Sequence, residues 1–124
     1  VADYENSLRV KLRNNGTGPM IISAITVSDG TSAKDCLVDW MPDLPGDRPW
    51  NNFTHALRHR ILQSGAEIVL LELTEHEDER DYPNCRDLVR KALAPLTVYV
   101  EYADIYESVM HPCKKPLSWF GRRV

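Results

Sequence analysis

The chain opens with two stretches of regularly patterned apolar residues, joined by a loop of turn-forming residues. In residues 8–13 (LRVKLR), leucine and valine alternate with arginine and lysine, which is the period of a β-strand with one solvent-exposed face. Residues 20–27 (MIISAITV) are rich in β-branched side chains, which also favour strands. Between them, residues 14–19 (NNGTGP) supply side chains that tolerate positive φ and a proline that cannot extend a strand. This pattern predicts the first two strands of an antiparallel β-sandwich or barrel.

Four further segments are predicted as strands. Residues 66–73 (AEIVLLEL) are apolar almost throughout, which is typical of a strand in the middle of a sheet. Residues 96–102 (LTVYVEY) have a second clear strand pattern. Residues 36–41 (CLVDWM), which follow an Asp-Gly turn signal, and residues 105–110 (IYESVM) are predicted to return as the remaining strands.

Helical periodicity is confined to short parts of the chain. Residues 83–93 carry apolar side chains at helical spacing, and Pro95 ends the amphipathic helix that they predict. Residues 50–58 fit either a short helix or an irregular segment. The charged residues 75–81 (EHEDERD) are predicted to form a solvated loop, because they lack the alternating order of a calcium-binding loop.

Size and charge limit the classes of protein to which the chain can belong. Its 124 residues and 43% hydrophobic content are typical of one globular domain. The net charge of −3 argues against a nucleic-acid partner. No apolar stretch approaches the roughly 20 residues of a membrane helix, so membrane attachment is expected only through segments absent from this chain. Because the chain starts at Val1 and soon enters a strand, we expect it to be part of a longer protein.

The three cysteines, Cys36, Cys85 and Cys113, are an odd number and do not make a complete disulfide framework. Free cysteine often behaves as a small core residue. We therefore expect free thiols and, in a protein tethered to a membrane, a location on the cytoplasmic side.

Three segments carry a resemblance to a known family. Residues 14–19 (NNGTGP) follow a strand, residues 62–67 (LQSGAE) precede one, and residues 100–106 (VEYADIY) come near the end of the chain. In this order they resemble the turn motifs of immunoglobulin-like β-sandwich domains in uncharacterised bacterial membrane-anchored proteins, although Glu107 stands where that family often has glycine. The resemblance implies this fold and a membrane-tethered context, and it implies no activity.

The pattern and the resemblance together predict a mainly all-β fold. We expect an immunoglobulin-like antiparallel β-sandwich of about seven strands with one or two short helical insertions. The sandwich is predicted to span residues 1–113. Residues 114–124 are predicted to be a C-terminal tail that packs back through Trp119 and Phe120.

Candidate chemistry in the sequence is sparse. His55 and His59 lie four residues apart, a spacing that places both on one face of a helix and can bind metal. Further ligands would come from His76, Cys85 or the pair His111 and Cys113, which lack the close spacing of structural zinc sites. Two exposed or helix-capping histidines are therefore the preferred interpretation, and no metal site is predicted. The sequence has no nucleophile-elbow motif and no glycine-rich phosphate loop before a helix, so no catalytic residue and no cofactor is predicted.

Aromatic residues provide the candidate binding surface. Trp50, Phe53, Trp119 and Phe120 lie in predicted loops or the tail, and tryptophan and phenylalanine are enriched at protein interfaces. We therefore predict a non-catalytic interaction module, the soluble part of a larger membrane-anchored bacterial protein, that binds a protein partner or itself. The alternative is a small-ligand sensor with a pocket between the sheets or under residues 40–60, and a metal-dependent hydrolase is a third possibility.

Overall fold

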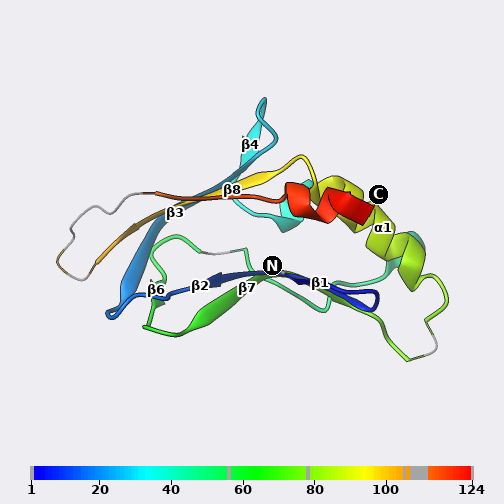
Figure 1. Cartoon of the computed structure of the whole chain (residues 1–124), viewed down its shortest axis with the longest axis horizontal. Coiled ribbons are helices and arrows are strands. Elements are labelled where there is room, and N and C mark those ends of the chain that lie inside the picture. Colours follow the sequence, from blue (N-terminus) through cyan, green and yellow to red (C-terminus); the bar gives the residue numbers. More distant parts are fainter. Residues whose placement is uncertain (1, 56, 78, 105, 107–111, 124) are drawn as a thin grey trace.

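The structure, a computed structural model, describes residues 2–55, 57–77, 79–104, 106 and 112–123. These residues form nine β-strands in two antiparallel sheets, with one α-helix and three short 3₁₀ helices (Figure 1). The sheets lie one above the other in Figure 1, and the α-helix lies at one end of them. The predicted two-sheet β architecture is therefore confirmed.

The first sheet contains four strands. In spatial order they are β1 (Ala2–Asp3), β2 (Ser7–Arg13), β7 (Glu67–Thr74) and β5 (Asn52–Phe53). Leu8 lies opposite Leu73 and Val10 lies opposite Leu71, and all four side chains are buried. The alternating pattern that predicted β2 therefore places its apolar side chains toward the second sheet and its charged side chains toward solvent.

The second sheet contains five strands. In spatial order they are β4 (Ala33–Lys34), β3 (Met20–Ser28), β8 (Thr97–Ala103) and β9 (Cys113–Pro116), and β6 (Ile61–Leu62) also pairs with β3. Strands β4 and β6 pair with opposite ends of β3, on the edge that β8 does not use. Strand β9 is exposed throughout and carries two lysines and a proline, side chains that protect a sheet edge against further pairing.

Helix α1 (Tyr82–Leu93) closes one end of the two sheets, and the 3₁₀ helix η3 (Ser118–Arg123) packs against it. The inward face of α1 carries Cys85, Val89 and Leu93, which are almost completely buried. The predicted helix over residues 83–93 is therefore confirmed. No helix among the described residues combines the length and apolar character needed to span a membrane.

The main predicted strands are confirmed to within one or two residues. Predicted segments 8–13, 20–27, 66–73 and 96–102 correspond to β2, β3, β7 and β8. Each has a strong local pattern and pairs along most of its length. The turn after β3 is confirmed too, because the Asp29 carboxylate accepts backbone N–H bonds from the two residues that close it.

The predicted strand over residues 36–41 is wrong. Pairing with β3 stops at β4, and the chain then forms the 3₁₀ helix η1 (Val38–Trp40). The Trp40 indole donates a hydrogen bond to the Val27 carbonyl at 3.0 Å, and Leu37 is buried in the core. The apolar run by itself would also allow an extended strand, but these two side-chain contacts favour the tight turn.

Other segments also differ from the prediction in detail. The described residues contain nine strands instead of about seven, because β1, β4, β5 and β6 are two-residue pairings with no sequence periodicity. The described residues of the segment 50–58 take the irregular alternative and include β5, and a further 3₁₀ helix, η2 (Pro45–Asp47), precedes them. The predicted strand over residues 105–110 lies outside the described residues, except for Tyr106. The predicted tail begins inside β9 and continues into η3.

Candidate functional site: a cleft between the sheets

The two sheets are joined along one side and open along the other. The chain passes from β5, an edge strand of the first sheet, to β6 on the second sheet within residues 54–60. This crossing closes the sandwich on that side. On the opposite side, no described segment joins β2 to β9.

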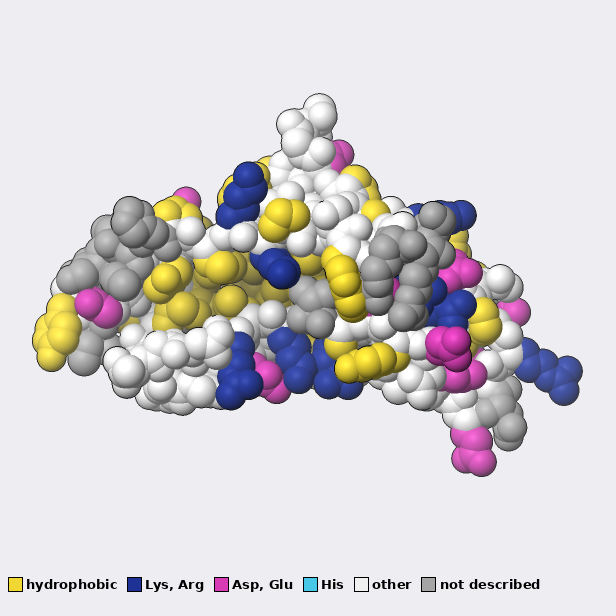
Figure 2. Space-filling view, in the orientation of Figure 1, with side chains coloured by type: hydrophobic (Ala, Val, Ile, Leu, Met, Phe, Trp, Pro, Cys, Tyr) yellow, Lys and Arg dark blue, Asp and Glu magenta, His cyan; other side chains and the backbone are white. Residues whose placement is uncertain are grey.

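A cleft of about 510 Å³ lies at this open side, between β2 and the strands β8 and β9. Figure 2 shows a hollow lined by hydrophobic side chains, with lysine and arginine side chains along its rim. The apolar part of the lining includes Leu12, Met20, Val100 and Tyr102. Arg13 lines the cleft as well, so a charged group borders a mainly apolar surface. A volume of this size is within the range of small-molecule and peptide pockets.

The edge of β2 beside this cleft is incompletely paired. Strand β1 pairs with β2 only opposite Leu8 and Arg9. From residue 10 to residue 13, no strand within the described ranges pairs with this edge. A free strand edge is a template for pairing with another extended chain.

Asn14 holds the loop that forms one end of the cleft. Its amide nitrogen donates hydrogen bonds to the carbonyls of Gly18 at 2.9 Å and Leu62 at 2.8 Å. Its amide oxygen accepts a hydrogen bond from the Gly16 backbone N–H at 2.9 Å. The residue is buried, so these bonds replace water and fix residues 14–19 against the turn before β7.

The four aromatic residues predicted as a binding surface do not form one surface. Trp50 is partly buried against the core, whereas Phe53 and Trp119 are each 44% exposed. Phe120 is completely buried, so it cannot be a surface contact in this fold, because η3 packs it into the core beside α1. None of the four lines the cleft. The sequence predicted a pocket between the sheets only as the alternative binding site, and it did not identify the lining residues, because the walls of the cleft come from residues far apart in sequence.

The candidate metal-ligating residues of the sequence are also dispersed. The described residues 55 and 57–59 are not helical, so the argument that placed His55 and His59 on one helical face does not apply. Cys85 is buried on the inward face of α1, Cys113 is exposed on β9, and His111 lies outside the described residues. Of these residues and His76, only His55 belongs to a group of three metal-ligating side chains in the described part of the chain.

That group consists of Cys36, Asp39 and His55, whose ligand atoms all lie within 4.8 Å of one another. His55 Nε2 lies 3.2 Å from Asp39 Oδ1. The Cys36 thiol donates a hydrogen bond to the His55 backbone carbonyl at 2.9 Å. Burial and the nearby carboxylates of Asp39 and Asp35 raise the pKa of the Cys36 thiol. Sequence spacing could have placed Cys36 and Asp39 together on one turn, but not beside His55.

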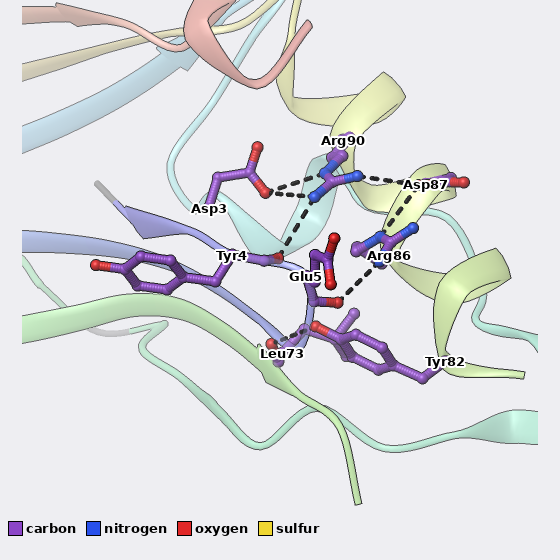
Figure 3. A network of polar contacts seen from close by, with 8 residues as sticks. All are labelled: Asp3, Tyr4, Glu5, Leu73, Tyr82, Arg86, Asp87 and Arg90. Atoms are coloured by element: carbon purple, nitrogen blue, oxygen red, sulfur yellow. Dashed lines mark hydrogen bonds and ion pairs between the residues drawn. The ribbon is translucent and has the colours of Figure 1, made fainter. Parts of the chain in front are cut away.

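A buried ion pair fastens the N-terminal strand to α1 (Figure 3). Asp3 Oδ1 accepts hydrogen bonds from Arg90 Nη2 at 2.8 Å and Arg90 Nε at 3.0 Å. Asp3 is 2% exposed and Arg90 is 4% exposed. Arg86, one turn earlier, donates a hydrogen bond to the Glu5 carbonyl at 2.8 Å. These contacts are structural, because they hold β1 beside β2 at the end away from the cleft.

Tyr82, at the start of α1, is a second buried polar group. Its hydroxyl donates a hydrogen bond to the Leu73 carbonyl at 3.2 Å, which ties the helix to β7 (Figure 3). Burial raises the pKa of Tyr82 to about 12. The hydroxyl therefore stays neutral at physiological pH and acts as a structural donor.

Comparison of the chain with known protein families, curated proteins and solved structures found no significant match.

Proposed function

We propose that this chain is a non-catalytic binding module and that the cleft between β2 and β9 is its binding surface. The observation that carries the proposal is an apolar cleft beside a stretch of the β2 edge with which no described strand pairs. Apolar surface that remains open to solvent is costly unless a ligand covers it. The strand edge adds backbone donors and acceptors that a ligand can satisfy.

The proposed ligand is an extended segment of a partner polypeptide. Such a segment can pair with residues 10–13 of β2 and place alternate side chains into the cleft, as in other complexes formed by β-strand addition. Leu12 and Tyr102 lie on opposite walls and provide apolar contacts for these side chains. Arg13 at the rim favours an acidic residue at the corresponding end of the partner.

A small apolar ligand is the second candidate, because the volume of about 510 Å³ suits a drug-sized molecule. Such a ligand would fill the cleft without pairing with β2. The two candidates therefore differ in the protection of the backbone amides of residues 10–13.

We also propose that the two sheets form an immunoglobulin-like sandwich in a membrane-anchored bacterial protein. The antiparallel pairing in both sheets and the turn at residues 14–19 support the architectural part of this proposal. The membrane-anchored context rests on the sequence resemblance alone. A topology reporter fused to the full-length natural protein would test it, and failure to fractionate with membranes would contradict it.

The binding proposal can be tested with peptides selected from a random linear-peptide library displayed on phage. Their affinity would be compared between the wild type and Gly18→Arg, which extends a long charged side chain at the cleft. A Cβ atom added at Gly18 would meet no other atom within 4 Å, so the first carbon of the arginine side chain fits without a steric clash. Thr31→Arg adds the same charge in an exposed turn away from the cleft and is the matched control.

We expect Gly18→Arg to weaken peptide binding at least about tenfold and Thr31→Arg to leave it unchanged. Bound peptide should slow hydrogen exchange at residues 10–13. Binding without this protection would favour the small-ligand candidate. Equal affinity for wild type and Gly18→Arg, or the absence of any enriched peptide, would contradict the proposal.

A further inference from the structure

We propose that Cys36, Asp39 and His55 bind a zinc ion at the surface of the second sheet. This site is separate from the cleft, since none of the three residues lines it. The inference does not rest on the proposed peptide-binding function. It rests on the donor atoms, their spacing and the contacts that hold them.

The donor set matches the preferences of zinc. A cysteine sulfur, a histidine nitrogen and a carboxylate oxygen are its usual protein ligands, and magnesium and calcium prefer oxygen donors. Three protein ligands leave a fourth tetrahedral position, which a water molecule would occupy. This combination of donors is more specific for zinc than a cluster of acidic residues would be, because it brings together three different types of zinc ligand.

The spacing also fits a tetrahedral ion. With zinc–nitrogen and zinc–oxygen bonds of about 2.0–2.1 Å, a tetrahedral edge between two such ligands is about 3.3 Å. His55 Nε2 and Asp39 Oδ1 are 3.2 Å apart. The Cys36 sulfur lies within 4.8 Å of a ring nitrogen of His55 and a carboxylate oxygen of Asp39, whereas a sulfur-containing edge is about 3.6 Å. A shift of about 1 Å in the cysteine side chain would complete the site.

Neighbouring contacts hold the ligands in place. Cys36 and Asp39 are three residues apart around η1, and the Trp40 indole fixes this turn to β3. The Lys34 ammonium donates a hydrogen bond to the Asp39 backbone carbonyl at 3.1 Å. The His55 imidazole packs edge-on against the Phe53 ring, with 5.3 Å between ring centroids. Ligands held before the ion arrives lose less conformational freedom on binding.

Zinc binding would change the hydrogen bonds of the cluster in a defined way. The Cys36 thiol, which donates to the His55 carbonyl, would lose its proton to solvent and bind the ion as thiolate. Asp39 would exchange its hydrogen bond with the His55 ring for a bond to the metal. His55 also lines a shallow pocket of about 300 Å³ with Asp35 and Arg58, so the site borders space open to small molecules.

Cobalt(II) provides a direct test, because it substitutes for zinc and gives a charge-transfer absorption band when a thiolate binds it. The reduced, chelator-treated chain would be titrated with Co²⁺ and then with Zn²⁺ as competitor. Cys36→Ser and His55→Asn each remove one ligand. Cys113→Ser and His59→Asn are matched controls, because both lie outside the cluster. Asparagine tolerates the positive φ of 67° at His59.

We expect one metal ion per chain and a thiolate band in the wild type and both controls. Cys36→Ser should lose the band, and His55→Asn should weaken zinc binding more than about 100-fold. His55 is exposed, so its variant remains informative should Cys36→Ser fail to fold. Absence of the band from the wild type, its persistence in Cys36→Ser or its loss in Cys113→Ser would overturn the proposal.

Discussion

We expect replacement of Asn14 with alanine to destabilise the fold by about 2–4 kcal/mol. The change removes three hydrogen bonds, to the Gly18 carbonyl, the Leu62 carbonyl and the Gly16 N–H, all 2.8–2.9 Å long. Each contributes about 1 kcal/mol net, and a buried partner that stays unsatisfied costs more. Because Asn14 is buried, water cannot readily replace the lost groups.

Urea unfolding monitored by tryptophan fluorescence would measure this loss of unfolding free energy. Asn15→Ala is the matched control, because Asn15 is the same residue type in the same loop and is exposed. The control should change stability by less than about 0.5 kcal/mol. A loss below about 1 kcal/mol in Asn14→Ala, with an unchanged dependence on urea concentration, would refute the reasoning.

Three further predictions concern buried or paired polar groups. Arg90→Met removes the guanidinium from the buried Asp3 carboxylate and should cost about 3–5 kcal/mol in chemical denaturation; a change below about 1 kcal/mol would contradict this. The Arg48 guanidinium holds the pKa of Glu79 below its ordinary value of 4.5 by a hydrogen bond, so this stabilisation is present above pH 4.5 and lost as pH falls through the lowered pKa. The free energy of unfolding should therefore fall more steeply on acidification in wild type than in Glu79→Gln. Parallel plots of unfolding free energy against pH for the two proteins would argue against this role of Glu79. Burial raises the pKa of Tyr82 to about 12, so its contribution to stability should be lost between pH 10 and about 12; an ultraviolet absorbance difference between wild type and Tyr82→Phe that is complete by pH 10 would exclude this.

Local sequence patterns predicted the long elements because each pattern reflects which side of an element is buried. The alternation in residues 8–13 and the helical spacing in residues 83–93 correspond to inward faces of β2 and α1. Residues 36–41 show the limit of this reasoning, because an apolar run fits a buried strand and a buried turn equally well. The Trp40 contact with the Val27 carbonyl decides between them.

The candidate site was less predictable than the fold. Aromatic composition drew attention to Phe120, which is buried, while the cleft is lined by the loop over residues 14–19 and by apolar side chains such as Leu12, Val100 and Tyr102. The interpretation of Asn14 as a turn former was incomplete, since its amide also reaches Leu62, 48 residues away. The spacing of His55 and His59 indicated a metal site only for a helix that does not form.

Local patterns in the sequence were enough to predict the main strands and the helix, because these depend on interactions between residues near one another in the chain. Tertiary structure alone decided which strand edges stay open and which polar groups meet. Asp3 and Arg90 are 87 residues apart, and Cys36 lies 19 residues from His55. Such contacts depend on how the two sheets pack and where the chain crosses between them, and no local pattern encodes that arrangement.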